Sequence, residues 1–373
     1  MGSRAFRTLG HRAGRELRLL VEPGARMIDE AECVLSVLLA ILLAHAIGAR
    51  NVSWAAFSGF MVMRGHVSES LLRGVLRIVG TAVGAGLALL VAPAVLPLVS
   101  LAALASAAVG GVTLYKALTA RRAYAWLFVG LTFEMILLDK LEHPGLAVTS
   151  FAATRLLEVA AGTTACVVVS TLSTLTARRR WPAAPAPAPA GTGWHPDAVR
   201  HAAQGAVALA LLPLIWSAFS VPQLAQSSIT IMAVMMVPVA GIGASGLVPV
   251  SRRLLQRAIG CLSGSALAAL FLFTAHGAPA VLVAGTCLGV VLGRHIENGR
   301  TAIAYAGTQF TLAILVTLVP DSYANAQIAP ALDRLTGILA GMAVLEPVLL
   351  AWHLATPLTR RASPMSREEA GGE

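Results

Sequence analysis

Residues 201–251 read HAAQGAVALALLPLIWSAFSVPQLAQSSITIMAVMMVPVAGIGASGLVPVS, and none of these 51 residues is Asp, Glu, Lys or Arg. Two further stretches without these four residue types cover 78–115 and 258–293. A helix needs about 20 apolar residues to cross a bilayer, so each stretch has room for two spans or nearly two. The runs are continuous rather than alternating, which indicates membrane helices and excludes a soluble enzyme.

The composition of the 373 residues supports the same class. Hydrophobic residues make up 57% and charged residues 12%, about half the charged share of a soluble domain. Only two residues are lysines and neither completes a GxxxxGK loop, so ATP hydrolysis is not expected. The four cysteines lie singly in apolar runs, which argues against disulfides and zinc. We therefore expect no catalytic residue, no metal, no cofactor and no bound nucleic acid.

The pattern predicts an all-α integral membrane protein with about twelve spans. The predicted spans are 32–49, 53–63, 75–92, 96–115, 123–138, 149–176, 202–219, 227–247, 258–275, 279–293, 301–319 and 335–356. With the N-terminus in the cytoplasm, 24 of the 28 basic residues fall on the inner side. This bias follows the positive-inside rule and accounts for the net charge of +10 without nucleic acid. We expect a multi-pass protein of the bacterial inner membrane with both termini cytoplasmic.

The middle of the chain separates two six-span halves. A Pro/Ala-rich linker is expected over 178–200, because it contains RRRWPAAPAPAPAGTGWHPD. The domain prediction places a basic cytoplasmic segment at 1–30 and a cytoplasmic tail at 358–373. The two membrane repeats lie between them, at 31–177 and 201–357.

Similar residues recur in the two halves. Arg77, Gly80 and Gly84 match Arg257, Gly260 and Gly264 at an offset of 180, and Arg155 matches Arg334 at 179. Gly130 aligns with Gly307 at 177, which makes Thr311 the counterpart of Glu134. Because each half has six spans, an even number, both halves begin on the cytoplasmic side. The repeats should therefore be parallel, related by an axis along the membrane normal.

The motif RGVLRIVGTAVGAG at 73–86, which includes Thr81, follows a short span opened by Trp54. A later arginine-led helix reads RLLEVAAGTTA at 155–165. This order resembles the fusaric acid resistance family, which includes aromatic acid exporters. The resemblance implies export of aromatic or other organic acids across the bacterial inner membrane. Many members carry a large cytoplasmic domain between the membrane halves, where this chain has only the linker.

The arginines inside the spans are the candidate anion contacts. An arginine at the centre of a span costs about 2.5–3.5 kcal/mol on insertion scales, so something must offset that cost. Arg155 either pairs with Glu158 or holds a carboxylate bidentately. Arg334 pairs with an acid of the first half or contacts substrate. Trp54 either stacks on an aromatic substrate or belongs to the interfacial belt.

The remaining candidate residues are acids, helix-start arginines, glycines and a histidine. Glu134 either pairs with Arg155 or carries a proton, and Glu346 in its protonated form donates a hydrogen bond beside Pro347. Arg77 and Arg257 are expected to snorkel to lipid headgroups. The motif glycines Gly80, Gly84, Gly260 and Gly264 should allow close helix contact or leave room for substrate. His295 is expected to be a solvated loop residue.

Three functions remain open at this point. The first is a secondary transporter exporting organic anions, with the proton gradient as its driving force. The second is a passive anion channel, which needs the arginines but no titrating acid. The third is a membrane scaffold or partner protein. Besides lipid and a small organic anion, a homo-oligomer and a periplasmic adaptor are considered as partners.

Overall fold

The protein is built from helices. The computed structural model describes residues 22–145, 147–184, 193–243, 245–299, 302–323 and 326–362, and these contain no strand. The helices of the first half are α2 (Ala25–Ala46), α3 (Val52–Val62), α4 (Val67–Val95), α5 (Val99–Thr119), α6 (Ala123–Glu142) and α7 (Val148–Leu175). The short helix α8 (Ala177–Arg180) follows them. The second half comprises α9 (Pro196–Phe219), α10 (Leu224–Met235), η1 (Val239–Gly241), α11 (Leu247–Ala275), α12 (Pro279–Asn298), α13 (Ala304–Leu318) and α14 (Ala329–Ala362).

The all-α prediction is confirmed, and eleven of the twelve predicted spans overlap one helix each. The span predicted at 227–247 is too long, because α10 ends at Met235 and η1 and the start of α11 follow within the predicted range. Among the described residues, seven helices are long and apolar enough to cross a membrane. These are α4, α5, α7, α9, α11, α12 and α14. Of the other five, α3, α10 and α13 are short, whereas α2 and α6 carry several charged residues. By the length and composition of these helices, the chain is a multi-pass membrane protein. The count of twelve spans stays a prediction.

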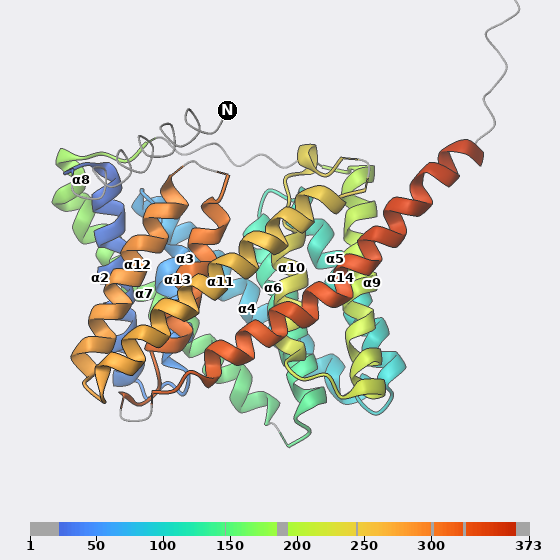
Figure 1. Ribbon diagram of the computed structural model, residues 1–373, viewed down its shortest axis with the longest axis horizontal. Coiled ribbons are helices and arrows are strands. Elements are labelled where there is room, and N and C mark those ends of the chain that lie inside the picture. The colour runs from blue at the N-terminus through green and yellow to red at the C-terminus, as the bar shows by residue number, and fades with distance from the viewer. Residues whose placement is uncertain are drawn as a thin grey trace, which may run out of the picture.

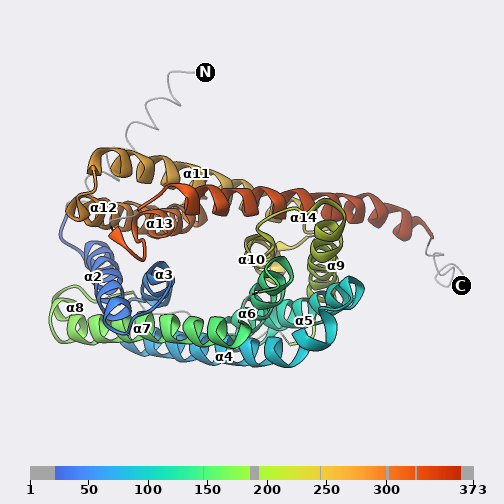
Figure 2. The ribbon, with the colours of Figure 1, turned by 90° about the horizontal axis from the view of Figure 1, so that it is seen from below.

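The helices form two long walls joined at both ends. Figure 2 shows α4 and α7 along one wall, and α11 and α14 along the other. Helices α2, α3, α12 and α13 fill one end, and α5, α6, α9 and α10 fill the other. Each end therefore mixes helices of both halves, and α2 packs on α12 as α5 packs on α9. The start of α2, the helix α8 and the end of α14 lie on the same side, at the top of Figure 1.

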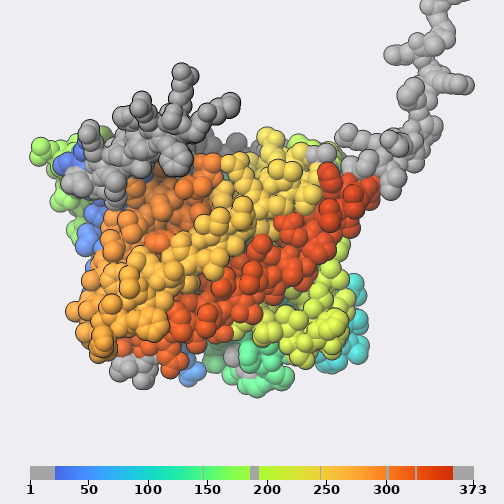
Figure 3. All heavy atoms as spheres, in the orientation of Figure 1, coloured from blue at the N-terminus to red at the C-terminus, as the bar shows by residue number. Residues whose placement is uncertain are grey.

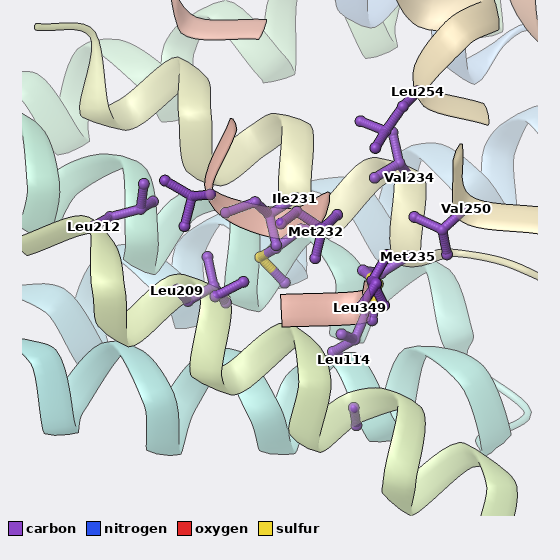
Figure 4. Packing of buried hydrophobic residues seen from close by; sticks show 14 of the residues in the cluster. Leu114, Leu209, Leu212, Ile231, Met232, Val234, Met235, Val250, Leu254 and Leu349 are labelled. Carbon is purple, nitrogen blue, oxygen red and sulfur yellow. The ribbon is translucent and has the colours of Figure 1, made fainter. Parts of the chain in front are cut away.

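A large apolar cluster joins the halves at one end. Leu114 of α5 packs with Leu209 and Leu212 of α9 and with Met232 of α10, all fully or almost fully buried. Figure 4 shows these side chains together with others from α10, α11 and α14. On the outside, α11 and α14 run diagonally side by side across one face (Figure 3). Their exposed side chains include many leucines and valines, as a lipid-facing surface requires.

The motif glycines allow close contact in both halves. A Cβ at Gly80 would lie 2.5 Å from the Ala125 carbonyl oxygen, and one at Gly260 would lie 2.9 Å from the Gln309 Cβ. Small residues of this kind let membrane helices approach one another closely. Gly84 and Gly264 contact α6 and α13 in the same manner, one turn further along.

These contacts correct the predicted alignment of the two halves, in which α6 of the first half corresponds to α13 of the second. Gly80 meets Ala125 and Phe128, whereas Gly260 meets Ala306 and Gln309, so the matching offset is 181. The alignment at 177 relied on two identical residue types rather than on packing, and it is wrong. Glu134 consequently corresponds to Leu315, and Gln309 corresponds to Phe128.

An ion-pair network joins the start of α2 to α8 and α12. Arg294 donates to both Asp29 carboxylate oxygens at 2.5 and 3.1 Å, and Arg178 donates to both Glu32 oxygens at 2.8 and 2.6 Å. His295 lies 2.7 Å from Glu30 and is 6% exposed. The prediction of a solvated loop for His295 is therefore wrong, because α12 continues to Asn298 and buries this histidine. Arg178 likewise belongs to a helix, while residues 185–192 of the linker lie outside the described residues.

We predict that Gly80→Ala and Gly260→Ala each destabilise the protein by about 1–3 kcal/mol, because the added methyl overpacks a helix contact. Gly86→Ala is the matched control, since a Cβ at Gly86 has nothing within 4 Å. Thermal unfolding of the purified variants in detergent checks this. Equal melting temperatures for Gly80→Ala and Gly86→Ala would contradict the packing.

A second prediction concerns the network at α12. Arg294→Gln removes the bidentate partner of the buried Asp29 and leaves it with Arg178 at 3.6 Å and the Asn298 amide, so it should cost stability, by up to about 3 kcal/mol. Arg252→Gln serves as control, because Arg252 is exposed on α11. Adding Asp29→Asn to Arg294→Gln should recover part of the loss in thermal unfolding. If the double variant is as unstable as the sum of its single variants, the pair does not interact.

Candidate functional site: an arginine-lined cavity between the halves

A cavity of about 190 Å³ lies between the two halves, and four arginines line it. They are Arg77, Arg253, Arg257 and Arg334, and no Asp or Glu belongs to the lining. The cavity walls come from α3, α4 and α6 of the first half and from α10, α11, α13 and α14 of the second. We call it the central cavity. The aromatic residues in its lining are Trp54, Phe57, Tyr124, Phe128 and Tyr305.

Arg77 and Arg257 occupy equivalent places at the inner part of this cavity. Each lies ten residues after the start of its long helix, which corresponds to about 15 Å along the axis. They are 3% and 1% exposed, so the prediction that they snorkel to headgroups is wrong. Arg77 donates to the Tyr124 hydroxyl at 3.3 Å and Arg257 to the Tyr305 hydroxyl at 3.4 Å. These tyrosines begin α6 and α13 and hold both guanidinium groups inside the protein.

Two more arginines stack on the same tyrosines. The guanidinium carbon of Arg73 lies 4.3 Å from the Tyr124 ring centroid, and that of Arg253 lies 4.4 Å from the Tyr305 ring centroid. Arg253 also donates to the Met236 carbonyl, where α10 has ended. Cation–π contacts stabilise guanidinium groups that are removed from water. The inner part of the cavity therefore carries the same arginine–tyrosine arrangement in both halves.

Arg155 and Arg334, the predicted pair inside the spans, differ in their partners. Arg155 donates to Glu158 at 3.1 Å, and Glu158 also accepts the backbone N–H of Asn51 at 3.1 Å. Arg334 instead donates to the Gln309 side-chain oxygen at 3.2 Å. Within the described part of the chain, Arg334 makes no ion pair. Arg334 is 4% exposed and lies over the Phe57 ring, so an amide oxygen and a ring face, rather than a described carboxylate, hold its charge.

Trp54 lies where the central cavity meets two neighbouring pockets. Its ring is stacked by Arg155, whose guanidinium carbon is 4.1 Å from the ring centroid. Trp54 lines the central cavity and a smaller pocket that also touches Thr81 and Arg155. The belt reading of Trp54 is thus wrong, because the ring is directed to the interior of the protein.

A wider polar vestibule of about 550 Å³ adjoins the central cavity, and the two share Trp54 and Arg334. It opens on the side where α2 and α9 end and α14 begins. Its polar lining includes the amide side chains of Asn51, Gln223, Gln226 and Gln327 and two acids, Asp321 and Asp333. With the predicted orientation, this side faces the periplasm.

Reciprocal carboxylates fix the two short helices that reach the vestibule. Glu142 at the end of α6 accepts the backbone N–H groups of Gln223 and Leu224 at 2.7 and 3.0 Å, which caps α10. Asp321 after α13 accepts the N–H of Val52 at 2.8 Å, which caps α3. A carboxylate at a helix N-terminus satisfies free N–H groups and the helix dipole. Each half therefore anchors the short helix of the other.

The other predicted acids lie apart from the central cavity. Glu134 is fully buried on α6 against Gly110 of α5, with the Ser106 side chain near its carboxyl group. It does not contact Arg155, which pairs with Glu158 instead. Glu346 is half-buried and accepts a hydrogen bond from the Ser251 hydroxyl at 3.0 Å. None of these acids lines the central cavity.

Several residues of the cavity escaped the sequence reasoning. Gln309, Tyr124 and Tyr305 are ordinary polar or aromatic residues in apolar helices, so nothing singled them out. A signal for the tyrosines exists in the pattern of matching glycine contacts, because their offset of 181 pairs Tyr124 with Tyr305. It also places Gln309 where the first half has Phe128.

Comparison with known proteins gives one match, in the first half of the chain. The family model described as fusaric acid resistance protein-like matches residues 39–169, which cover most of the first half. No curated protein and no solved structure matches the chain. The matched segment contains Trp54, the 73–86 motif and Arg155, on which the resemblance rested. The resemblance is thus confirmed over residues 39–169, where the chain is similar to the fusaric acid resistance protein-like family.

Proposed function

We propose that the chain transports small organic anions, aromatic ones included, across the bacterial inner membrane through the central cavity. The observation that carries this proposal is a cavity that four arginines line, three of them buried, with no carboxylate among the described residues of its lining. Charged side chains at membrane depth are costly and typically mark a substrate path. A field of one sign in a cavity with low-dielectric walls concentrates counter-ions there, and here those are anions.

The membrane arrangement is part of the same proposal. We infer two parallel six-helix repeats, related by a rotation near 180° about the membrane normal, with both termini in the cytoplasm. The matched arginine–tyrosine contacts and the matched glycine contacts support this relation. The reciprocal caps on α3 and α10 also support it. The central cavity would then lie on the axis between the repeats, where transporters of this construction bind substrate.

The driving force has two candidates, and one observation favours passive movement. The lining of the central cavity contains no Asp, Glu or His, so no group there exchanges protons readily with an anion. An inside-negative potential pushes anions outward by about 2.3 kcal/mol per charge and 100 mV. This corresponds to a concentration ratio of about fortyfold. Proton coupling would instead require a buried acid outside the lining, such as Glu134.

We predict that neutralising the two arginines has different results. Arg334→Gln should lower flux of an aromatic acid about tenfold or more while protein yield stays normal, because a charge-assisted contact contributes about 1.5–3 kcal/mol. Arg155→Gln leaves Glu158 buried without its partner and should lower yield and melting temperature first. Radiolabelled benzoate flux in proteoliposomes, normalised to incorporated protein, measures both. A normal flux for well-expressed Arg334→Gln would exclude Arg334 as the anion contact.

A fourth prediction separates the driving forces. In proteoliposomes with a potassium diffusion potential, benzoate should move toward the positive side without any pH gradient. Glu134→Gln should leave this movement unchanged, because Glu134 is outside the cavity. If movement needs a pH gradient and Glu134→Gln abolishes it, the protein is a proton-coupled exporter. Absence of flux for all tested anions under both gradients would favour a scaffold role.

A further inference from the structure

We propose that the anion is held in the second half alone, between Arg257 and Arg334. In this proposal the side-chain oxygen of Gln309 occupies the place that a carboxylate oxygen takes when the anion binds. The inference rests on the proposed function and assigns a binding seat and a specificity-determining residue within that path.

Gln309 brings the two guanidinium groups together. Its Oε1 accepts from Arg257 Nη1 at 2.8 Å and from Arg334 Nη2 at 3.2 Å. The three side chains are 1%, 4% and 2% exposed, in the order Arg257, Arg334, Gln309. Two cations thus converge on one neutral oxygen, and guanidinium pairs are normally found around carboxylates or phosphates.

Several guanidinium N–H groups of this seat remain free to donate a hydrogen bond. Nη2 and Nε of Arg257 and Nε of Arg334 are buried and have no hydrogen-bond partner among the residues that the structure describes. Buried N–H groups without partners are rare in proteins, and each one calls for an explanation. Both arginines line the central cavity, so a small anion in it would reach these donors.

The first half cannot offer the same seat. Phe128 occupies the place of Gln309, and Arg77 lies over its ring at 4.2 Å. Arg155, the counterpart of Arg334, is neutralised by Glu158. In the second half the counterpart of Glu158 is Gly337, which contacts Gln226 and leaves no acid. The equivalent arginine pairs therefore differ in charge: in the pair Arg77 and Arg155, Arg155 has Glu158 beside it, whereas Arg257 and Arg334 have no acid partner among the described residues.

The surroundings indicate a small planar carboxylate. Phe57 lies beneath Arg334, with 5.8 Å between the guanidinium carbon and the ring centroid, and it lines the same cavity. A ring on the substrate can pack against this face while its carboxylate takes the seat. The cavity of about 190 Å³ is smaller than the ~300–1,000 Å³ of drug-sized ligand sites, which favours a single ring.

The test uses two substitutions at Gln309 with opposite expected effects. Gln309→Glu places a tethered carboxylate between the arginines, so the ligand-free protein should melt at a higher temperature and bind benzoate about tenfold more weakly. Gln309→Met keeps the volume but removes the acceptor. Its melting temperature should fall, and benzoate should raise that temperature by more than it does in the natural chain.

The readout is thermal unfolding and calorimetric binding in detergent, with benzoate and with benzamide as its neutral counterpart. Gln256→Glu is the control, because it adds the same charge on α11 next to Arg257 but does not line the cavity. Benzamide should give no response in any chain. Gln256→Glu should bind benzoate like the natural chain.

The outcomes separate this inference from the proposed function. If the natural chain transports benzoate and Gln309→Glu still binds it normally, the seat is wrong and the transport function stands. If Gln309→Glu fails to fold or melts lower, the seat is also wrong, because a carboxylate between two guanidinium groups must stabilise them. If Gln309→Glu melts higher but no anion binds or moves in the natural chain, the arginine pair is real and the transport function is wrong.

Discussion

The structure depends on how arginines are kept inside an apolar protein without enough acids to neutralise them. A guanidinium removed from water must find hydrogen-bond acceptors or ring faces. Tyr124 and Tyr305 serve Arg77 and Arg257, and Gln309 serves two arginines at once. These partners all lie at the interface of the halves. The positive cavity and the packing of the halves therefore follow from the same constraint.

The two halves share their packing but differ in charge. The glycines of α4 and α11 set the same approach of α6 and α13, so the arginine–tyrosine contacts recur at equal depth. At the outer part, Glu158 neutralises Arg155, while Gly337 leaves Arg334 with an amide and a ring. The contacts between the halves also differ at the two ends of the molecule. Ion pairs join α2 to α12 at one end, whereas an apolar cluster joins α5 to α9 and α10 at the other. One backbone plan thus provides a structural arginine in one half and an available one in the other.

The sequence predicted the helices and the interior arginines, because continuous apolar runs and rare charges are strong local signals. It failed where position depends on packing between distant helices. The snorkelling reading of Arg77 was reasonable for an isolated span, but a span does not reveal that α6 covers that face. The loop prediction for His295 fails because α12 continues five residues beyond the predicted end at 293, to Asn298. Gln309 carried no sequence signal until glycine contacts fixed the register of α13 against α6.

The central claim is that the arginine-lined cavity is a path for anions. The most direct test compares how fast thiol reagents of opposite charge react with a cysteine in the cavity. Thr308 lines the cavity, and Thr308→Cys is nearly isosteric. The four native cysteines are first replaced by serine, and thiol reagents of equal size but opposite charge are then applied in proteoliposomes. The account predicts that the anionic reagent reacts faster at residue 308 and that benzoate slows it. Faster reaction of the cationic reagent, or no effect of benzoate, would contradict the account.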